Sequence, residues 1–378
     1  MKNIILFLTF IIIFSVIFPV YSQKITQEEV DKQIENLKNH LTPDNTGRET
    51  VFEVKAFLKN DVIEISGKVL TIEQKQIIES TLSKLGKINS TISYFPYPEI
   101  GKMSYGIVRR PYINLYVKPK LETGENLATQ ALMGMTCKIL EKKDNFRKIK
   151  LDHDGYICWA LTSDLKEVDF NAWDKWINLK KVMIIKNIEK PELYFTTKLP
   201  LVAQKQGYFK VIAPDNNVIL LSNKEARIFD GKIDKNNIIN TAKQFLNTSW
   251  LKRKTSYLWG GTKGSELDCS GFVQTVFRAN GIDLPRDADQ QQKFCTPIAL
   301  NLSNIDELKP GDLIFFSKHR KWATHVGIYI GNYEFIHSSP KGVYSGVKIN
   351  TLRGGDDYDK FLQEIYFGAG RIDKDIIK

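Results

Sequence analysis

The chain opens with a long apolar run and then changes to a mixed pattern. A lysine precedes the hydrophobic segment from Ile4 to Phe18, Pro19 ends it, and Val20-Tyr21-Ser22 follows. This order predicts a secretory signal over residues 1–22 and an exported protein of the periplasm or the extracellular space. An uncleaved anchor is the alternative, because the run is long for a signal. No later stretch has the roughly 20 apolar residues that cross a bilayer, so we expect no stable membrane insertion after signal cleavage.

Residues 23–99 show two hydrophobic periods. Apolar residues recur at helical spacing in some segments and at every second position in others, which predicts helices and strands in alternation. In chain order we expect a helix over 24–40, strands over 51–57 and 62–69, a helix over 72–85 and a strand over 88–95. This pattern is typical of a small α+β domain. Its segment DVIEISGKVLTIEQKQIIESTL resembles the small secreted domains called BON.

Between residues 100 and 232 the apolar runs become short, and turn residues separate them closely. The runs of residues 100–168 predict a small β-barrel. Residues 169–232 repeat the pattern in degraded form, since GYFKVIAPDNNVILLSNKEARIF parallels DNFRKIKLDHDGYICWALTSDL. We therefore expect two related barrels in tandem, with a linker at 173–181.

Residues 233–378 form the last unit, in which one predicted helix begins with a cysteine. In SELDCSGFVQTVFRANG the apolar residues fall on one helical face, Asp268 stands at the N-cap position and Asn280-Gly281 supplies the stop. Cys269 is then the first helical residue, where free backbone N–H groups and the helix dipole lower the pKa of a thiol. Such a thiolate attacks an acyl carbon. The alternative is a small hydrophobic residue packed under a capped helix.

A base for this thiol has to come from the five histidines of the chain. His325 begins an apolar strand, and His337 lies in the return strand of the same predicted hairpin. With a strict two-residue Gly331-Asn332 loop, the two side chains would point to opposite faces. If His337 orients His325, the hairpin must contain an odd residue, so we predict an irregularity at Gly331 to Tyr333. A half-buried structural histidine is the alternative for His337.

Five motifs in residues 238–371 resemble the NlpC family of bacterial cell-wall cysteine peptidases. In chain order they are YLWGG, DCSGFV, LPRDADQQ, GDLIFF and HVGIYIGNYEFIHSS. The resemblance implies a papain-like α+β fold for this unit. The barrels before it resemble the SH3-like domains of γ-D-glutamyl-L-diamino acid endopeptidases, which cleave murein peptides between D-glutamate and the diamino acid. The expected fold class is therefore multi-domain α+β, with a papain-like catalytic domain preceded by two SH3-like barrels and the small N-terminal α+β unit.

The resemblance implies a role for each matching residue. Cys269 would be the nucleophile, His325 the base and His337 the third polar residue. Tyr257 would contribute to the oxyanion site together with the Cys269 backbone N–H. The other matches would bind substrate: Asp268 and Ser270 would hold the free amine of an N-terminal L-alanine, and Arg286-Asp287 stands where the subgroup has Arg-Ser or Arg-Asp.

Two further candidates come from the first barrel, which in such enzymes closes one end of the cleft. Tyr156 matches a tyrosine before the final tryptophan of the barrel, and Glu125 lies before a matching stretch, LATQALMG. A buried carboxylate at this end would reject stem peptides that are still linked to glycan, because their acylated alanine cannot pair with it. The implied partners are murein peptides with a free N-terminal L-alanine.

Composition and charge exclude several other classes. The chain has 378 residues, of which 42% are hydrophobic and 26% charged, so it is neither mostly disordered nor a multi-span membrane protein. The net charge of +11 is spread along the chain without a base-reading motif, so we expect no nucleic-acid partner. No histidines or cysteines have the paired spacing of a zinc site, and we expect no metal and no cofactor. The oligomeric state stays open.

Four cysteines are too few for a disulfide scaffold at this length. Cys137 and Cys158 lie in neighbouring predicted strands, where they could form a disulfide or remain as two buried thiols. Two other functions also stay open. One is a non-catalytic peptidoglycan-binding protein, and the other is a thiol amidase or acyltransferase that acts on a different acyl substrate.

Overall fold

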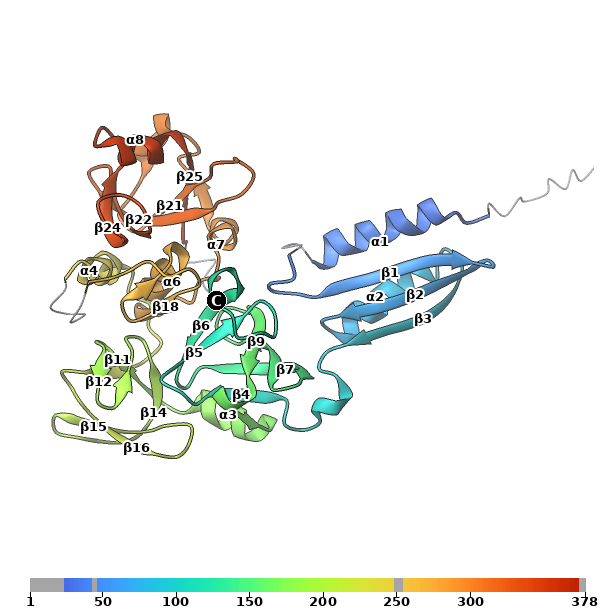
Figure 1. Cartoon of the computed structure of the whole chain (residues 1–378), viewed down its shortest axis with the longest axis horizontal. Helices are drawn as coiled ribbons and strands as arrows, with labels where there is room; N and C mark the ends of the chain where they lie inside the picture. The colour runs from blue at the N-terminus through green and yellow to red at the C-terminus, as the bar shows by residue number, and fades with distance from the viewer. Residues whose placement is uncertain (1–23, 43–45, 248–253, 374–378) are drawn as a thin grey trace, which may run out of the picture.

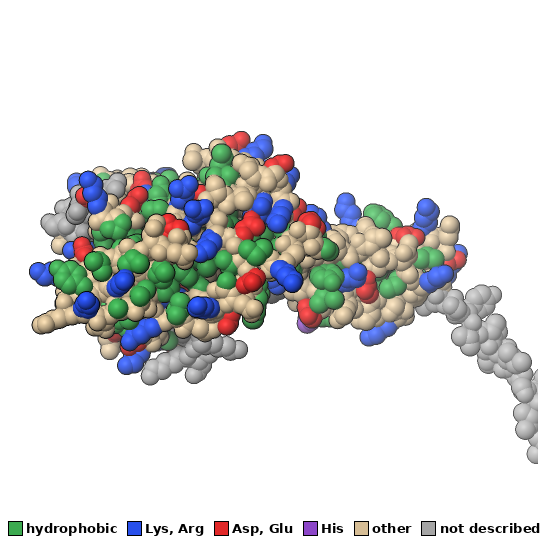
Figure 2. Space-filling model, turned by 90° about the horizontal axis from the view of Figure 1, so that it is seen from below, with side chains coloured by type: hydrophobic (Ala, Val, Ile, Leu, Met, Phe, Trp, Pro, Cys, Tyr) green, Lys and Arg blue, Asp and Glu red, His purple; other side chains and the backbone are tan. Residues whose placement is uncertain are grey.

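The computed structural model describes residues 24–42, 46–247 and 254–373 (Figure 1). Four groups of elements follow one another along the chain, and Figure 1 shows the first of them, in blue, beside the other three. The predicted signal segment lies outside the described residues. Among the helices that the structure describes, none is long and apolar enough to span a bilayer. Figure 2 shows basic side chains scattered among acidic ones on the face it presents.

The N-terminal unit is a three-stranded sheet with two helices packed on it. Its strands pair in the order β1-β2-β3, antiparallel and then parallel. Both helices begin at a threonine capping box, Thr26 with Glu29 and Thr71 with Gln74, and their apolar faces meet the buried side of the sheet. The elements lie close to their predicted ranges: α1 (Gln27–Leu41), β1 (Phe52–Lys59), β2 (Val62–Val69), α2 (Ile72–Leu82) and β3 (Lys87–Tyr94).

The first β unit contains seven short strands in one sheet, in the order β10-β4-β7-β8-β9-β5-β6. Cys137 and Cys158 are free, buried thiols in its core, so the buried-thiol alternative is confirmed. The strands are β4 (Tyr105–Val108), β5 (Tyr112–Tyr116), β6 (Leu127–Leu132), β7 (Thr136–Lys143), β8 (Phe146–Leu151), β9 (Ile157–Leu161) and β10 (Leu165–Val168).

A short helix joins the two β units and overlaps the segment 173–181 that was predicted as a linker. Asp169 caps α3 (Phe170–Asn178) by accepting a hydrogen bond from the Ala172 N–H. The second β unit has a five-stranded sheet in the order β16-β15-β14-β11-β17, a separate core and a small hairpin. Its strands are β11 (Lys181–Ile184), β12 (Ile188–Glu189), β13 (Glu192–Leu193), β14 (Lys198–Lys205), β15 (Tyr208–Ile212), β16 (Val218–Ser222) and β17 (Ala226–Phe229).

The C-terminal unit is built on a six-stranded antiparallel sheet in the order β20-β25-β21-β22-β23-β24. Apolar residues cover both of its faces, one beneath α6 and the other beneath α8. The helices are α4 (Ile238–Gln244), α6 (Cys269–Ala279), α7 (Ala288–Phe294) and α8 (Asp357–Glu364). The strands are β18 (Thr262–Lys263), β19 (Glu266–Leu267), β20 (Thr296–Ile298), β21 (Leu313–Phe316), β22 (His325–Gly331), β23 (Glu334–Ser339), β24 (Gly346–Thr351) and β25 (Tyr366–Arg371).

Candidate active site

The first turn of α6 holds Cys269 where the sequence predicts it. Asp268 is the N-cap residue, and its carboxylate accepts hydrogen bonds from the N–H groups of Gly271, at 2.7 Å, and Gly260, at 2.9 Å. Gly271 allows this turn to pack closely, because a Cβ there would lie 2.1 Å from the Gly261 carbonyl oxygen. The DCSG segment is therefore fixed both by its own cap and by the Trp-Gly-Gly loop above it.

The predicted lowering of the Cys269 pKa is wrong in sign for the free protein. Burial raises the pKa of this thiol to about 12, and the nearby Asp268 carboxylate adds to the rise. The backbone N–H groups of Val326 and Ser270, together with Arg286, act in the opposite direction but do not offset burial. The thiol therefore rests in its neutral form. Its closeness to the Val326 N–H places it beside the residue that follows His325.

The hairpin of β22 and β23 contains the predicted irregularity, displaced slightly along the chain. The register shifts between Tyr329 and Gly331, and the turn residues Asn332 and Tyr333 both have positive φ. The extra residue brings His325 and His337 to the same face of the sheet. His325 Nε2 lies 2.6 Å from His337 Nδ1.

Both imidazoles are held neutral. Burial lowers the pKa of His325 from 6.5 to about 4, although Asp268 acts in the opposite direction. Burial and the neighbouring His325 lower the pKa of His337 well below its usual value. At neutral pH the candidate pair is thus a neutral thiol and a neutral base, and proton transfer between them belongs to the reaction instead of preceding it.

A hydrogen-bonded chain continues from His337 into the core of the C-terminal unit. His337 Nε2 lies 2.8 Å from Asn350 Oδ1, and Asn350 Nδ2 donates to Asp359 Oδ1 over 2.6 Å. Neither Asn350 nor Asp359 was predicted from the sequence. Strand alternation could have indicated Asn350, because apolar and polar residues alternate in Val347-Lys348-Ile349-Asn350.

These hydrogen bonds fix the tautomers of both histidines. A carboxylate only accepts hydrogen bonds, so the amide nitrogen of Asn350 must face Asp359 and its oxygen must face His337. His337 then carries its proton on Nε2 and accepts at Nδ1 from the Nε2–H of His325. Nδ1 of His325 is left unprotonated, as a base that accepts the proton of a thiol requires.

The hydroxyl of Tyr257 is close enough to Cys269 for the two groups to interact electrostatically. Burial raises the pKa of its hydroxyl strongly, and Cys269 and Asp268 raise it further. The hydroxyl is therefore a permanent donor at any pH at which the protein works. A donor near the Cys269 N–H can stabilise an oxyanion formed by attack of the sulfur.

Arg286 joins Asp268 and Ser270 to the first β unit. It is 1% exposed, and its guanidinium donates to Asp268 over 2.5 and 3.1 Å and to the Ser270 hydroxyl over 2.9 Å. Its Nε donates to Thr129 Oγ1, on β6, over 2.7 Å. A buried guanidinium with this many acceptors locks the nucleophile's turn against the neighbouring unit.

Tyr156 and Asp287 also meet, and a residue of the N-terminal unit joins them. The Tyr156 hydroxyl donates to Asp287 Oδ2 over 3.1 Å. Arg48 donates to the same oxygen over 2.7 Å and to Asp289 over 2.6 and 2.9 Å, while its carbonyl accepts from the Ile157 N–H. Arg48 could not be predicted from the sequence, because its partners lie about 240 positions away along the chain.

The structure does not bring Glu125 to this group. Glu125 is exposed in the short 3₁₀ turn Gly124–Asn126, and among the described residues it makes no hydrogen bond or ion pair with the other candidates. Thr129 and Gln130 make the contact instead, since the Thr262 N–H donates to Gln130 Oε1 over 3.0 Å. In the described ranges no group of three His, Cys, Asp or Glu residues is arranged to hold a metal ion.

Comparisons with known proteins match both the catalytic segment and the first β unit. Residues 254–365 match the NlpC/P60 family, and residues 115–165 match the bacterial dipeptidyl-peptidase Sh3 domain. The γ-D-glutamyl-L-lysine dipeptidyl-peptidase of Bacillus subtilis is 33% identical over 235 residues, which is 61% of this chain and 74% of that protein.

Two Bacillus cereus proteins give similar matches. The γ-D-glutamyl-L-lysine dipeptidyl-peptidase of that species is 28% identical over 241 residues, covering 58% of this chain and 69% of its own length. The crystal structure of an NlpC/P60 family protein from B. cereus superposes with a TM-score of 0.60 at 24% identity, over 71% of this chain and 99% of the other. The structural likeness supports a shared fold.

Proposed function

Because the chain belongs to the NlpC/P60 family and is a hydrolase of the cysteine peptidase type, we propose that it cleaves the bond between D-glutamate and the diamino acid in murein peptides. The substrate would carry a free N-terminal L-alanine, and the protein would act after export. The observation that carries the proposal is the run His325, His337, Asn350 and Asp359, which leaves Nδ1 of His325 unprotonated one residue before Val326, whose backbone N–H contacts the Cys269 thiol. We also assign the second β unit as a second SH3-like domain.

The proposed reaction follows from these positions. Nδ1 of His325 takes the thiol proton as the sulfur of Cys269 attacks the γ-carbonyl carbon of D-glutamate. The oxyanion accepts hydrogen bonds from the Cys269 N–H and the Tyr257 hydroxyl. His325 then returns the proton to the leaving amine, and a thioester remains. Water, deprotonated by the same imidazole, hydrolyses the thioester and restores the neutral pair.

Charge balance near α7 supports selectivity for a free amine. Asp268, Asp287 and Asp289 supply three carboxylates, while Arg286 and Arg48 supply two guanidinium groups. The set lacks one positive charge, which an alanine ammonium group would provide. An acylated amine would leave this excess negative charge uncompensated in a half-buried site, because the Asp287 and Asp289 side chains are 26% and 15% exposed, at a cost near the lower end of roughly 2–5 kcal/mol.

The proposal is tested with L-alanyl-γ-D-glutamyl-diamino acid and its N-acetylated form. By the cost above, kcat/KM should fall by about 30-fold or more when the amine is acetylated. Intact sacculi should be cleaved more slowly still. Equal rates for the two peptides would exclude recognition of the amine, and the peptidase activity itself would be tested separately by product identity.

A further inference from the structure

A second cavity lies where three units of the structure meet, away from the candidate active site. Its volume is about 390 Å³, within the range of small-molecule sites. The first β unit contributes residues near β7 and the turn after β8, the connecting helix α3 contributes two tryptophans, and the second β unit contributes β14 and β17. The C-terminal end of α6 supplies Arg278.

Arg278 is an incompletely paired buried cation. It is 2% exposed, and its NH2 group donates to Gln274 Oε1 over 2.8 Å. Among the described residues Nε and NH1 have no hydrogen-bond partner, and the nearest carboxylate oxygen there, on the partly exposed Asp283, lies 3.8 Å from Nε. A buried guanidinium with unpaired donors is costly, so such a group is a candidate to bind an acceptor from outside the chain.

Other unpaired polar atoms belong to residues that line the same cavity. His153 Nδ1 and Thr196 Oγ1 are buried and have no partner in the part of the chain that the structure describes, although His153 Nε2 lies 3.2 Å from Asp154. Eight buried side-chain atoms of the described residues lack a partner, and four of them belong to Arg278, His153 and Thr196. This concentration in one cavity is difficult to explain by packing, because unpaired buried groups are rare and each needs a cause.

The walls of the cavity indicate an anion with an apolar or ring-shaped body. Trp173 and Trp176 line it, and their indole N–H groups already donate to Asp152 and to the Gly134 carbonyl. Trp173 stacks on Tyr105 with ring centroids 4.7 Å apart, and Lys181 Nζ lies 5.0 Å from the Trp176 ring centroid, so the remaining ring surface is apolar and has no free donor.

The charged groups that line the cavity give it a net positive charge. The cations are Arg278, Lys181 and Lys198, and the carboxylates are Asp152 and Asp283. Leaving His153 aside, the side chains that line the cavity carry one more positive than negative charge, and the nearby buried Asp154 carboxylate lies 3.2 Å from His153 Nε2. A ligand with a single negative charge would balance the excess on the lining side chains.

We propose that this cavity binds a small monocarboxylate, with the carboxylate accepting from Arg278 and the body of the ligand against Trp173 and Trp176. Arg278 lies nine positions after Cys269 on α6, roughly 13 Å along the helix axis, so the site is distinct from the one that would hold the scissile bond. The proposal does not depend on the peptidase reaction. Its carboxylate could belong to a lactyl ether on an amino sugar or to the C-terminus of a D-amino acid.

Isothermal titration calorimetry of the whole chain distinguishes the lactyl carboxylate of an amino sugar from the C-terminal carboxylate of a D-amino acid. The probes are N-acetylmuramic acid, N-acetyl-D-alanine and, as the uncharged match of the first, N-acetylglucosamine. Saturable binding of at least one carboxylate probe, without binding of N-acetylglucosamine, is expected, and the tighter probe identifies the source. Equal binding of N-acetylglucosamine and N-acetylmuramic acid would overturn the proposal. The absence of any binding would also overturn the proposal. It would mean that a small movement of Asp283 pairs its carboxylate with the free donors of Arg278.

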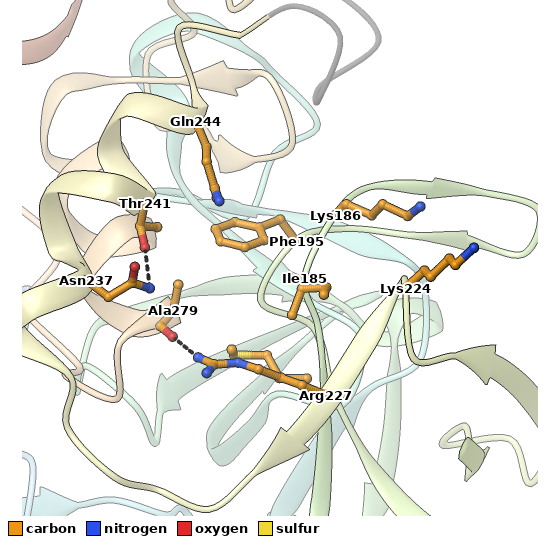
Figure 3. A pocket seen from close by; sticks show the side chains of 10 residues that line it. Ile185, Lys186, Phe195, Lys224, Arg227, Asn237, Thr241, Gln244 and Ala279 are labelled. Atoms are coloured by element: carbon orange, nitrogen blue, oxygen red, sulfur yellow. Dashed lines mark hydrogen bonds between the residues drawn. The ribbon is translucent and has the colours of Figure 1, made fainter. Parts of the chain in front are cut away.

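Variants locate the binding. Arg278→Met should weaken carboxylate binding about tenfold or more without lowering Tm, since it replaces an incompletely paired charge by an apolar chain. The matched control is Arg227→Met. Arg227 lines a different cavity, of about 350 Å³, where it donates to the Ala279 carbonyl over 2.9 Å (Figure 3). Binding should be unchanged in this control.

A second variant keeps the test decisive if Arg278→Met does not fold. Thr196→Val preserves the shape of the side chain and removes the unpaired hydroxyl, so binding should weaken several-fold. Unchanged affinity in both variants, or an equal loss in Arg227→Met, would place the ligand elsewhere and refute the assignment.

Discussion

Replacing Asn350 by leucine removes the group that determines which nitrogen of His337 carries the proton. Leucine has a similar shape but can neither accept from His337 Nε2 nor donate to Asp359. His337 is 0% exposed, so water cannot take over the lost contact. The Asp359 carboxylate keeps its backbone donors, the N–H groups of Thr351 and Asp356, and helix α8 should remain in place.

The size of the effect follows from one unpaired donor. A buried Nε2–H without an acceptor costs about 1–3 kcal/mol. His337 escapes this cost by moving its proton to Nδ1, and His325 must then accept at Nε2 and carry its own proton on Nδ1, the nitrogen needed as the base. The productive tautomer is thus disfavoured by the same 1–3 kcal/mol. At 1.36 kcal/mol per tenfold change, kcat should fall roughly 5- to 150-fold.

Steady-state kinetics on the free-amine tripeptide measure this effect. We expect the loss in kcat with KM nearly unchanged, because Asn350 does not approach the substrate. Thr351→Val is the matched control in the same strand, since its hydroxyl bonds only to the backbone of Tyr333 and Arg353. A kcat within twofold of wild type in Asn350→Leu would refute the tautomer argument, as would an equal loss in Thr351→Val.

Three further expectations concern pH, the buried ion pair and the N-terminal unit. Because the folded pKa of His325 is about 4 instead of 6.5, the pH profile of kcat/KM should have its acidic limb near pH 4. The contribution of His325 to the free energy of unfolding should be complete above pH 6.5 and lost as the pH falls through 4. An acidic limb at pH 6.5 would contradict this. Arg286→Met should lower the free energy of unfolding in urea by about 3–5 kcal/mol, because it breaks a buried ion pair with Asp268. Arg353→Met, whose ion pair with Asp306 is exposed, should lower it by less than about 1 kcal/mol. Equal losses in the two variants would contradict this expectation. Arg48→Met should accelerate hydrogen exchange at the Ile157 amide roughly tenfold, and unchanged exchange would show that the ion pairs do not hold this loop.

Features set by neighbouring residues could be predicted from the sequence. The N-cap at Asp268 and the first helical position of Cys269 depend on one turn of chain, and both were predicted correctly. The bulge in the β22–β23 hairpin followed from requiring two histidines on one face, but its position was wrong by about two residues. The short helix α3, predicted as a linker, was missed because it spans little more than two turns.

Features set by burial and by distant parts of the chain could not be predicted. The helix dipole at Cys269 is evident from the sequence, but the desolvation that outweighs it exists only in the folded protein. The partners of Asp287 come from two other units, so Arg48 had no local signal. The same applies to Thr129, which meets Arg286 where the resemblance suggested Glu125.

The most direct test is the hydrolysis of L-alanyl-γ-D-glutamyl tripeptides that end in L-lysine or meso-diaminopimelate, with products identified by mass spectrometry. Wild-type protein and the Cys269→Ala variant are compared side by side. The wild type should release L-alanyl-D-glutamate and the free diamino acid, and the variant should release neither. Cleavage by Cys269→Ala, or release of L-alanine alone by the wild type, would contradict the account.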